Sequence, residues 1–287
     1  MLSAVNPTET SDEALLEVAG EAARAACEVL RGSFGSSALR VHAKAPNDLV
    51  SSADHAAEEA IVEVVRRHLP DAAFLAEEGG RSGDPASELE WVIDPLDGTN
   101  NFLQGLPIFA TSIACRRNGR TVVGVVAEPL TGAVFSARRG GGAFRDGVPL
   151  AVSGHGGLDG AFLATGFPFR AHAALDLYLG AFRDVFLRSR AIRRCGSAAL
   201  DLAWTAAGIY DGFFELRLSP WDIAAGALLV EEAGGLVTDL DGGQRLFETG
   251  NVLAGSPGVW RELQHTVTRH ADEARVAAAD RPPALVS

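Results

Sequence analysis

The segment Asp94-Pro95-Leu96-Asp97-Gly98-Thr99 places the strongest constraint on the fold of this 287-residue chain, and it directly follows the apolar run Trp91-Val92-Ile93. An apolar run that ends at a proline and a glycine predicts a short buried strand, here ending on Asp94. Pro95 stiffens the turn between the two aspartates, and Gly98 lets the backbone approach a ligand closely. The sequence therefore predicts fixed, accessible carboxylates at the end of a strand.

Two further segments carry acids in comparable positions. Glu77-Glu78 follows the strand-like run 72–76, and Trp221-Asp222 opens a predicted helix over 222–233. Carboxylates that are brought together repel one another unless a cation lies between them, and oxygen ligands, including backbone carbonyls, are the ligands that Mg²⁺ accepts. If a helix begins at Thr99, its N–H groups point at an anion. Together the three segments predict a metal site that handles phosphate.

Each of these segments alone also has a structural explanation. A pair such as Glu77-Glu78 is typical of a solvated surface, Trp221-Asp222 is typical of a helix cap, and residues 94–99 fit a turn. Only the combination of the three segments favours a functional site over these explanations.

The spacing of apolar residues predicts the elements on both sides of the motif. Residues 12–32 and 54–69 have helical spacing, whereas residues 33–53 are predicted to form a loop. Residues 111–152 alternate strand-like runs with turn signals, which predicts an antiparallel meander. Gly140-Gly141-Gly142 is a turn of this meander rather than a P-loop, because no Gly-Lys-Ser/Thr follows it.

The second half of the chain alternates strands with helices. The predicted strands are 161–165, 210–216, 235–239 and 251–254, and the predicted helices are 172–189, 197–207, 222–233 and 257–275. This alternation predicts a layered α/β or α+β architecture.

Composition and charge exclude several classes of protein. The formal net charge is −12, which disfavours direct binding to nucleic acid and to acidic membranes. The three cysteines form no CxxC pair, and no window is apolar for about 18 residues, so we expect neither a disulfide framework nor a membrane span. The seven histidines show no ligand spacing, and Cys195 has no histidine partner in a catalytic pattern, so neither is assigned to catalysis. We expect a cytoplasmic protein.

Two of these segments resemble the signatures of the inositol monophosphatase family. Residues 94–102 are similar to the first signature, and residues 221–226, followed by 231–235, are similar to the second. Residues 163–169 and 196–202 are most similar to those of bacterial inositol-1-monophosphatases, and the resemblance extends over about 12–270. It implies a layered αβαβα sandwich of the inositol monophosphatase and fructose-1,6-bisphosphatase type, and a homodimer. We expect one catalytic unit over 1–287, with an N-terminal half (12–152), a C-terminal half (153–276) and a frayed tail (277–287).

The resemblance also implies two or three Mg²⁺ ions. Glu77, Asp94 and the backbone carbonyl of Leu96 correspond to the ligands of one ion. Asp94, Asp97 and Asp222 correspond to the ligands of a second, and Glu77 also to that of a weaker third. Leu96 replaces the usual isoleucine, Asn100 a common threonine and Ala76 a frequent glycine, but no ligand is lost. The region 33–47 differs more, which leaves the contribution of its loop to the third ion open.

The catalytic residues that the resemblance implies are Asp48, Thr99 and Glu77. Thr99 and Asp48 match the pair that activates the attacking water, and the backbone N–H groups of Gly98 and Thr99 match those that hold the phosphate. The residues that match contacts to substrate hydroxyls are Asp97, Gly196, Ser197, Ala198, Glu215 and Asp222, and Arg193 matches an arginine that reaches toward the site. Glu215 also fits an exposed strand acid.

The predicted activity is the Mg²⁺-dependent hydrolysis of inositol-1-phosphate, or of related sugar and polyol phosphates, with inhibition by lithium. Fructose-1,6-bisphosphate, 3′-phosphoadenosine-5′-phosphate and histidinol phosphate remain alternative substrates, because the metal motifs of the superfamily do not separate them. An alternative of another class is a protein partner in transcription antitermination, in which Arg193-Arg194 would belong to the binding surface.

Overall fold

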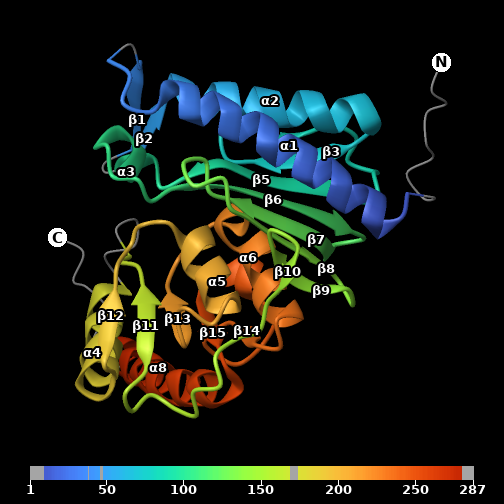
Figure 1. The fold of residues 1–287 in the computed structure, drawn as a ribbon. Helices are drawn as coiled ribbons and strands as arrows, with labels where there is room; N and C mark the ends of the chain where they lie inside the picture. The colour runs from blue at the N-terminus through green and yellow to red at the C-terminus, as the bar shows by residue number, and fades with distance from the viewer. Residues whose placement is uncertain (1–9, 38, 46–47, 169–173, 280–287) are drawn as a thin grey trace.

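The computed structural model describes residues 10–37, 39–45, 48–168 and 174–279. Its elements stack in five layers, helices and sheets in alternation (Figure 1). The layered αβαβα sandwich predicted from the sequence is therefore confirmed. No helix in the described ranges is both long and apolar enough to cross a membrane.

Helices α1 (Asp12–Ser33) and α2 (Ser52–His68) form the first layer, above the larger sheet in Figure 1. The hydroxyl of Ser11 caps α1 by accepting a hydrogen bond from the amide of Ala14 at 3.2 Å. The buried face of α1 consists mainly of alanine and leucine, which lets the helix lie close to α2 and to the sheet.

The larger sheet has eight strands in the order β10-β9-β8-β7-β6-β5-β3-β4. The strands are β3 (Ala73–Ala76), β4 (Gly80–Ser82), β5 (Leu89–Asp97), β6 (Ala110–Arg117), β7 (Arg120–Ala127), β8 (Val134–Arg138), β9 (Gly142–Arg145) and β10 (Val148–Pro149). Strands β6 to β10 are the predicted antiparallel meander, whereas β3 and β5 are parallel. This parallel pair brings the ends of β3 and β5 to the same edge of the sheet.

Helices α5 (Ala198–Ala206) and α6 (Pro220–Glu232) fill the layer between the two sheets (Figure 1). Both helices are buried along most of their length. A Cβ atom at Gly124 on β7 would lie 2.9 Å from Cα of Ala225, so α6 contacts the sheet backbone directly. Glycine is required there for the close packing of these two layers.

The smaller sheet and two outer helices complete the fold. The sheet has the order β12-β11-β13-β15-β14, with strands β11 (Phe162–Thr165), β12 (Ala191–Arg193), β13 (Gly212–Glu215), β14 (Leu236–Thr238) and β15 (Val252–Gly255). Helices α4 (Leu175–Arg188) and α8 (Pro257–Ala279) cover its outer face, and α3 (Thr99–Leu103) and α7 (Leu246–Thr249) are short.

Several predicted boundaries are wrong, and one segment was predicted as the wrong type. Residues 33–53 were predicted as a loop, but they contain the antiparallel hairpin β1 (Val41–Ala45) and β2 (Asp48–Ser51). These strands are short and lack an apolar run, so the pattern rule misses them. Strand β5 continues through Pro95 to Asp97, because its pairing with β6 shifts register between Asp94 and Asp97 and needs no N–H from Pro95.

Two predictions for the C-terminal part of the chain extend to residues outside the described ranges. The predicted helix 172–189 starts at Leu175 in the structure, and residues 172–173 are not among those described. Helix α8 continues to Ala279, into the predicted tail, whose residues 280–287 also lie outside the described ranges.

Candidate active site

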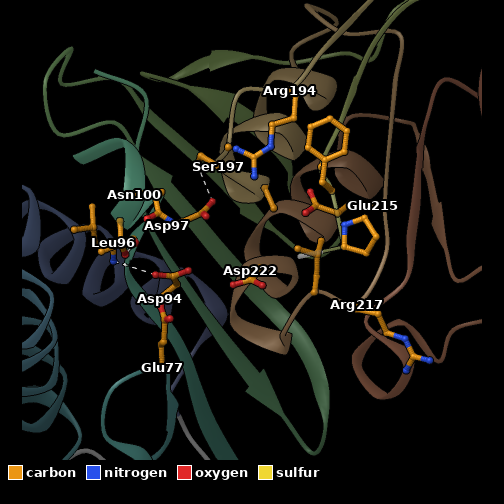
Figure 2. Close-up of a pocket in the computed structure, with 18 of the residues that line it drawn as sticks. Glu77, Asp94, Leu96, Asp97, Asn100, Arg194, Ser197, Glu215, Arg217 and Asp222 are labelled. Carbon is orange, nitrogen blue, oxygen red and sulfur yellow. Dashed lines mark hydrogen bonds between the residues drawn. The ribbon is translucent and has the colours of Figure 1, made fainter. Parts of the chain in front are cut away.

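A cavity of about 170 Å³ lies where the N-terminal and C-terminal halves meet. Five carboxylates line it, and four of them belong to the predicted acidic segments: those of Glu77, Asp94, Asp97 and Asp222. In Figure 2, Glu77 and Asp94 lie on one side and Asp222 faces them from the other. The structure thus brings together the acids of the three segments that the sequence singled out.

Asp94 is the most deeply enclosed of the four acids, since only 2% of its surface is exposed. Its Oδ1 accepts a hydrogen bond from the amide of Leu96 at 3.0 Å. Burial raises the pKa of Asp94 well above its usual value, and the neighbouring charges of Glu77, Asp97 and Asp222 raise it further. Without a cation, the site therefore disfavours a full set of negative charges.

Asp97 connects the motif to the C-terminal half. Its Oδ2 accepts hydrogen bonds from the hydroxyl of Ser197 at 2.7 Å and from the amide of Ala199 at 2.6 Å, at the start of α5. Burial raises the pKa of Asp97 to about 6, although both hydrogen bonds oppose that rise. The carboxylate of Asp97 is thereby fixed on the helix terminus.

Asp222 lies at a helix start and Glu77 at a strand end. Asp222 belongs to the capping box of α6, in which its Oδ2 accepts a hydrogen bond from the amide of Ser219 at 2.8 Å. Glu77 follows β3, and its amide donates to the carbonyl of Ile93 on β5 at 3.1 Å. Both acids therefore project from rigid elements.

The donor set fits a hard divalent cation in its chemistry. In the described part of the chain, no three acidic, histidine or cysteine side chains converge closely enough to enclose a metal ion as they stand. The argument for a cation comes from charge repulsion instead. The carboxylates of Glu77, Asp97 and Asp222 repel that of the buried Asp94, and a bound cation would relieve this repulsion. Carboxylate and carbonyl oxygens are the ligands that Mg²⁺ prefers.

The hydroxyl of Thr99 has a partner that the sequence did not predict. The hydroxyl of Thr99 lies 3.0 Å from Oδ1 of Asp54 and 3.0 Å from the carbonyl oxygen of Leu96, and it can donate to one of them at a time. The prediction had paired Thr99 with Asp48, which begins β2 and whose side chain is not among those described. Asp54 can contact Thr99 because it lies in the first turn of α2, and Thr99 follows closely after β5.

Asp54 is fixed by the start of its own helix. Its Oδ2 accepts hydrogen bonds from the amide and the hydroxyl of Ser51, at 2.9 Å and 2.6 Å, which forms the capping box of α2. Oδ1 is the oxygen that faces Thr99. The pattern Ser51-x-x-Asp54 was a signal for this position, because a capping box fixes where the acid points.

The remaining predicted substrate residues line the cavity, with one exception. Gly98, Gly196, Ser197, Ala198 and Glu215 are all part of its wall. Arg193 is not: its guanidinium lies 4.8 Å from the ring centre of Phe162, and the neighbouring Arg194 lines the cavity instead.

Close backbone contacts shape this part of the wall. A Cβ atom at Gly166 would lie 2.0 Å from Cδ of Glu215, so the carboxyl group of Glu215 packs directly against the backbone of Gly166. The side-chain Nδ2 of Asn101 donates to the carbonyls of Ile108 and Cys195, at 2.7 Å and 2.8 Å, and so connects α3 to the segment before Gly196. The two halves of the cavity are therefore linked by hydrogen bonds.

Several residues that line the cavity are not predicted from the sequence. They are Leu49, Asn100, Gly166, Phe167, Pro168, Arg194, Leu216, Arg217 and Leu218. Most of them come from the C-terminal half, where no acidic motif marks the position.

Comparison with known proteins identifies the family. The sequence profile of the Inositol monophosphatase family matches residues 11–275. The chain is 47% identical to the Nus factor SuhB of Pseudomonas aeruginosa over 262 residues, which is 89% of this chain and 96% of that protein. It is 43% identical to an inositol-1-monophosphatase of Mesorhizobium japonicum over 257 residues, which is 89% of this chain and 97% of that one. The crystal structure of the extragenic suppressor protein suhB from Bartonella henselae has a TM-score of 0.86 and 40% identity, covering 89% of this chain and 99% of its own. The chain therefore belongs to the inositol monophosphatase family.

Proposed function

We propose that this protein is a Mg²⁺-dependent phosphomonoesterase. The observation that carries this proposal is the convergence of four carboxylates, from three separate segments, on one cavity that contains the buried Asp94. Family membership and the similarity to a protein named inositol-1-monophosphatase support the same chemistry.

The ligand assignment follows from the family resemblance and from the position of the acids. Glu77, Asp94 and the carbonyl oxygen of Leu96 would hold one Mg²⁺, and Asp94, Asp97 and Asp222 a second. A third, weaker ion would involve Glu77. Bound there, the ions would supply a water of lowered pKa and neutralise charge on the leaving oxygen.

Thr99 and Asp54 would act on the water that attacks the phosphorus. The hydroxyl of Thr99 is held by Asp54, so its oxygen lone pairs can orient a water molecule in the cavity. Oδ1 of Asp54 can accept the proton of the Thr99 hydroxyl in this arrangement, while Oδ2 stays bound to Ser51. The backbone N–H groups of Gly98 and Thr99 would hold the phosphate. Glu77 would act through the metal that it binds.

The proposed substrate is inositol-1-phosphate, with related sugar and polyol phosphates also accepted. Hydroxyl groups of the alcohol would meet Asp97, Ser197, Glu215 and Asp222, while Gly196 and Ala198 leave room beside them. Arg194, which lines the cavity, would take the role predicted for Arg193.

A panel of esters tests this proposal. Phosphate release is measured from inositol-1-phosphate, fructose-1,6-bisphosphate, 3′-phosphoadenosine-5′-phosphate and histidinol phosphate, each with Mg²⁺ and with a chelator. We expect Mg²⁺-dependent release with the highest kcat/KM on the inositol ester, and inhibition by millimolar Li⁺. Preference for another ester would keep the chemistry and change the substrate, whereas no turnover on any ester would contradict the proposal.

A second candidate function is that of a protein partner in transcription antitermination. The observation that favours it is the 47% identity to a protein named Nus factor SuhB, and these names support this role more directly than they support any one substrate. The net charge of −12 favours contact with proteins over direct contact with RNA. Terminator read-through with purified RNA polymerase, with and without this protein, tests it. Asp94→Asn would abolish hydrolysis and leave read-through intact if the second role is separate.

We further propose a cytoplasmic homodimer with no membrane contact. Cys27, Cys115 and Cys195 are all free thiols, as is usual in a reducing compartment. Light scattering in solution tests the dimer: a monomeric mass at micromolar concentration would contradict it.

A further inference from the structure

Glu58 is a buried acid on α2 that does not line the cavity and to which the proposed mechanism gives no role. Only 8% of its surface is exposed. Its Oε2 accepts a hydrogen bond from the amide of Glu78 at 2.9 Å, and its Oε1 accepts one from the amide of Gly79 at 2.7 Å. A buried carboxylate is costly unless such donors satisfy it, so this contact fixes the backbone after Glu77.

Gly79 shows how close this contact is. A Cβ atom at Gly79 would lie 2.7 Å from Oε1 of Glu58, and no other residue lies in its way within 4 Å. Gly79 is also not in the left-handed backbone region, so a side chain there meets no conformational barrier. A side chain at position 79 would therefore displace the Glu58 carboxylate from this contact.

Glu77 lies between two anchor points. On one side, its own amide is bonded to Ile93 in the last step of the β3–β5 pairing. On the other side, the next two amides are bonded to Glu58. The direction of the Glu77 side chain is thus set by a strand pair before it and by a helix carboxylate after it.

Glu58 and Asp54 share one face of α2, because residues four apart are neighbours on a helix. Asp54 is bonded to Thr99, and Glu58 to the turn that carries Glu77. One helix therefore holds two separate catalytic segments at a fixed spacing.

We propose that Glu58 is a positioning residue that aims Glu77 at Asp94 and thereby sets the affinity for Mg²⁺. The inference rests on the proposed function only in taking Glu77 as a metal ligand. A hydrogen-bond partner that orients a ligand commonly changes metal affinity by about 10–100-fold when it is removed.

Mg²⁺ binding without substrate is the direct test. Isothermal titration calorimetry compares the wild type with Glu58→Gln and Glu58→Ala, and Glu59→Gln, an exposed acid on the same helix, is the matched control. We expect the Kd for Mg²⁺ to rise by about tenfold or more in Glu58→Ala and by less in Glu58→Gln, which keeps one acceptor oxygen. The control should bind as the wild type does, and kcat at saturating Mg²⁺ should remain close to the wild-type value in Glu58→Gln.

Gly79→Ala perturbs the same contact from the other side. In the wild-type background it should weaken Mg²⁺ binding, because the new Cβ displaces the Glu58 carboxylate. In the Glu58→Ala background it should change the Kd for Mg²⁺ little further, since the carboxylate that the new Cβ would displace is absent. Gly79→Ala in the wild-type background and Glu58→Gln keep the proposal testable even if Glu58→Ala folds poorly.

Two outcomes overturn the proposal. A lower Tm of the metal-free Glu58 variants with an unchanged Kd for Mg²⁺ would show a purely structural role. Additive effects of Gly79→Ala and Glu58→Ala would show that the two residues do not act through their contact. A wild type that binds no Mg²⁺ at all would instead remove the proposed function, and this inference with it.

Discussion

The two sides of the cavity are built differently. The acid wall, made of Glu77, Asp94, Asp97 and Asp222, lies on strand ends and helix caps. Each of these four residues is held by a hydrogen bond of its carboxylate or its backbone, at 2.7–3.1 Å. The outer wall, made of Phe167, Arg194, Glu215 and Arg217, presents more exposed side chains: 38% of Phe167 is exposed, and Arg217 is exposed with a φ of 65°. In Figure 2, Arg217 extends away from the acids.

This difference separates chemistry from selectivity. Groups that bind metal and activate water must be held within a fraction of an ångström, which needs rigid elements. Groups that select the alcohol part of the ester need only match its shape and its hydrogen-bonding groups. We therefore expect substitutions in the acid wall to abolish activity and those in the outer wall to change the preferred substrate.

The largest expected effect is that of Asp94→Asn. Loss of the central carboxylate should lower kcat/KM by about a thousandfold or more, because metal coordination contributes several kcal/mol to catalysis. The metal-free variant should be at least as stable as the wild type, since an unfavourable buried charge is removed. Phosphate release and the Tm in the presence of chelator check both parts. Loss of folding rather than of activity would contradict the account.

The next effect distinguishes Asp54 from Asp48. Asp54→Asn should lower kcat by about a hundredfold with little change in Mg²⁺ affinity, because it removes the negative charge that takes up the proton. It also leaves one acceptor oxygen where the carboxylate uses two, one for Thr99 and one for Ser51. Asp48→Asn is the matched comparison and should have a much smaller effect. The kcat values of both variants at saturating Mg²⁺ test this prediction. A larger loss of kcat in Asp48→Asn than in Asp54→Asn would favour the pairing of Thr99 with Asp48.

A pH effect on stability follows from the raised pKa values of Asp94 and Asp97. A buried acid whose pKa is higher in the folded than in the unfolded state stabilises the fold below about pH 3.8, and this contribution is lost as the pH rises through the folded pKa. For Asp97 the folded pKa is about 6, so the metal-free protein should lose Tm between pH 4 and 7, by about 5 °C or more.

Mg²⁺ and Asp94→Asn are the controls for this pH effect. Saturating Mg²⁺ should remove most of the loss, and Asp94→Asn should reduce it. Thermal unfolding in buffers from pH 4 to 7 measures both. A Tm that is insensitive to Mg²⁺ at pH 7 would contradict the metal assignment.

The smallest effects are expected in the outer wall. Glu215→Gln should change KM for polyol phosphates by up to about tenfold and leave Mg²⁺ affinity unchanged, because only hydrogen bonds to the alcohol are altered. Arg217→Gly should stabilise the protein by about 1 kcal/mol at most, since glycine accepts a left-handed backbone without strain. Kinetics on two different esters, together with Tm, would show whether this wall selects substrate.

The acid wall could be predicted from the sequence because its acids follow local signals. Asp94 and Glu77 end apolar runs, and Asp222 opens a helix, so each position is defined by its own neighbours. Asp97 follows from the same motif. The five-layer fold could likewise be predicted from the alternation of strands and helices together with the family resemblance.

The errors concern positions that only tertiary structure defines. Asp48 precedes α2 and Asp54 lies in its first turn, and only the tertiary structure shows that Asp54 meets Thr99. Arg193 and Arg194 are neighbours in the sequence, but only the latter lines the cavity. The outer wall has no motif of its own, so it could not be assigned without the structure.

The central claim is that the acid wall binds Mg²⁺ in order to hydrolyse a phosphate ester. The most direct measurement is phosphate release from inositol-1-phosphate during titration with Mg²⁺, starting from chelated protein. We expect no release without metal, a saturable rise with Mg²⁺, and no rise for Asp94→Asn. Release that persists in chelator, or an equal rise in Asp94→Asn, would contradict the account.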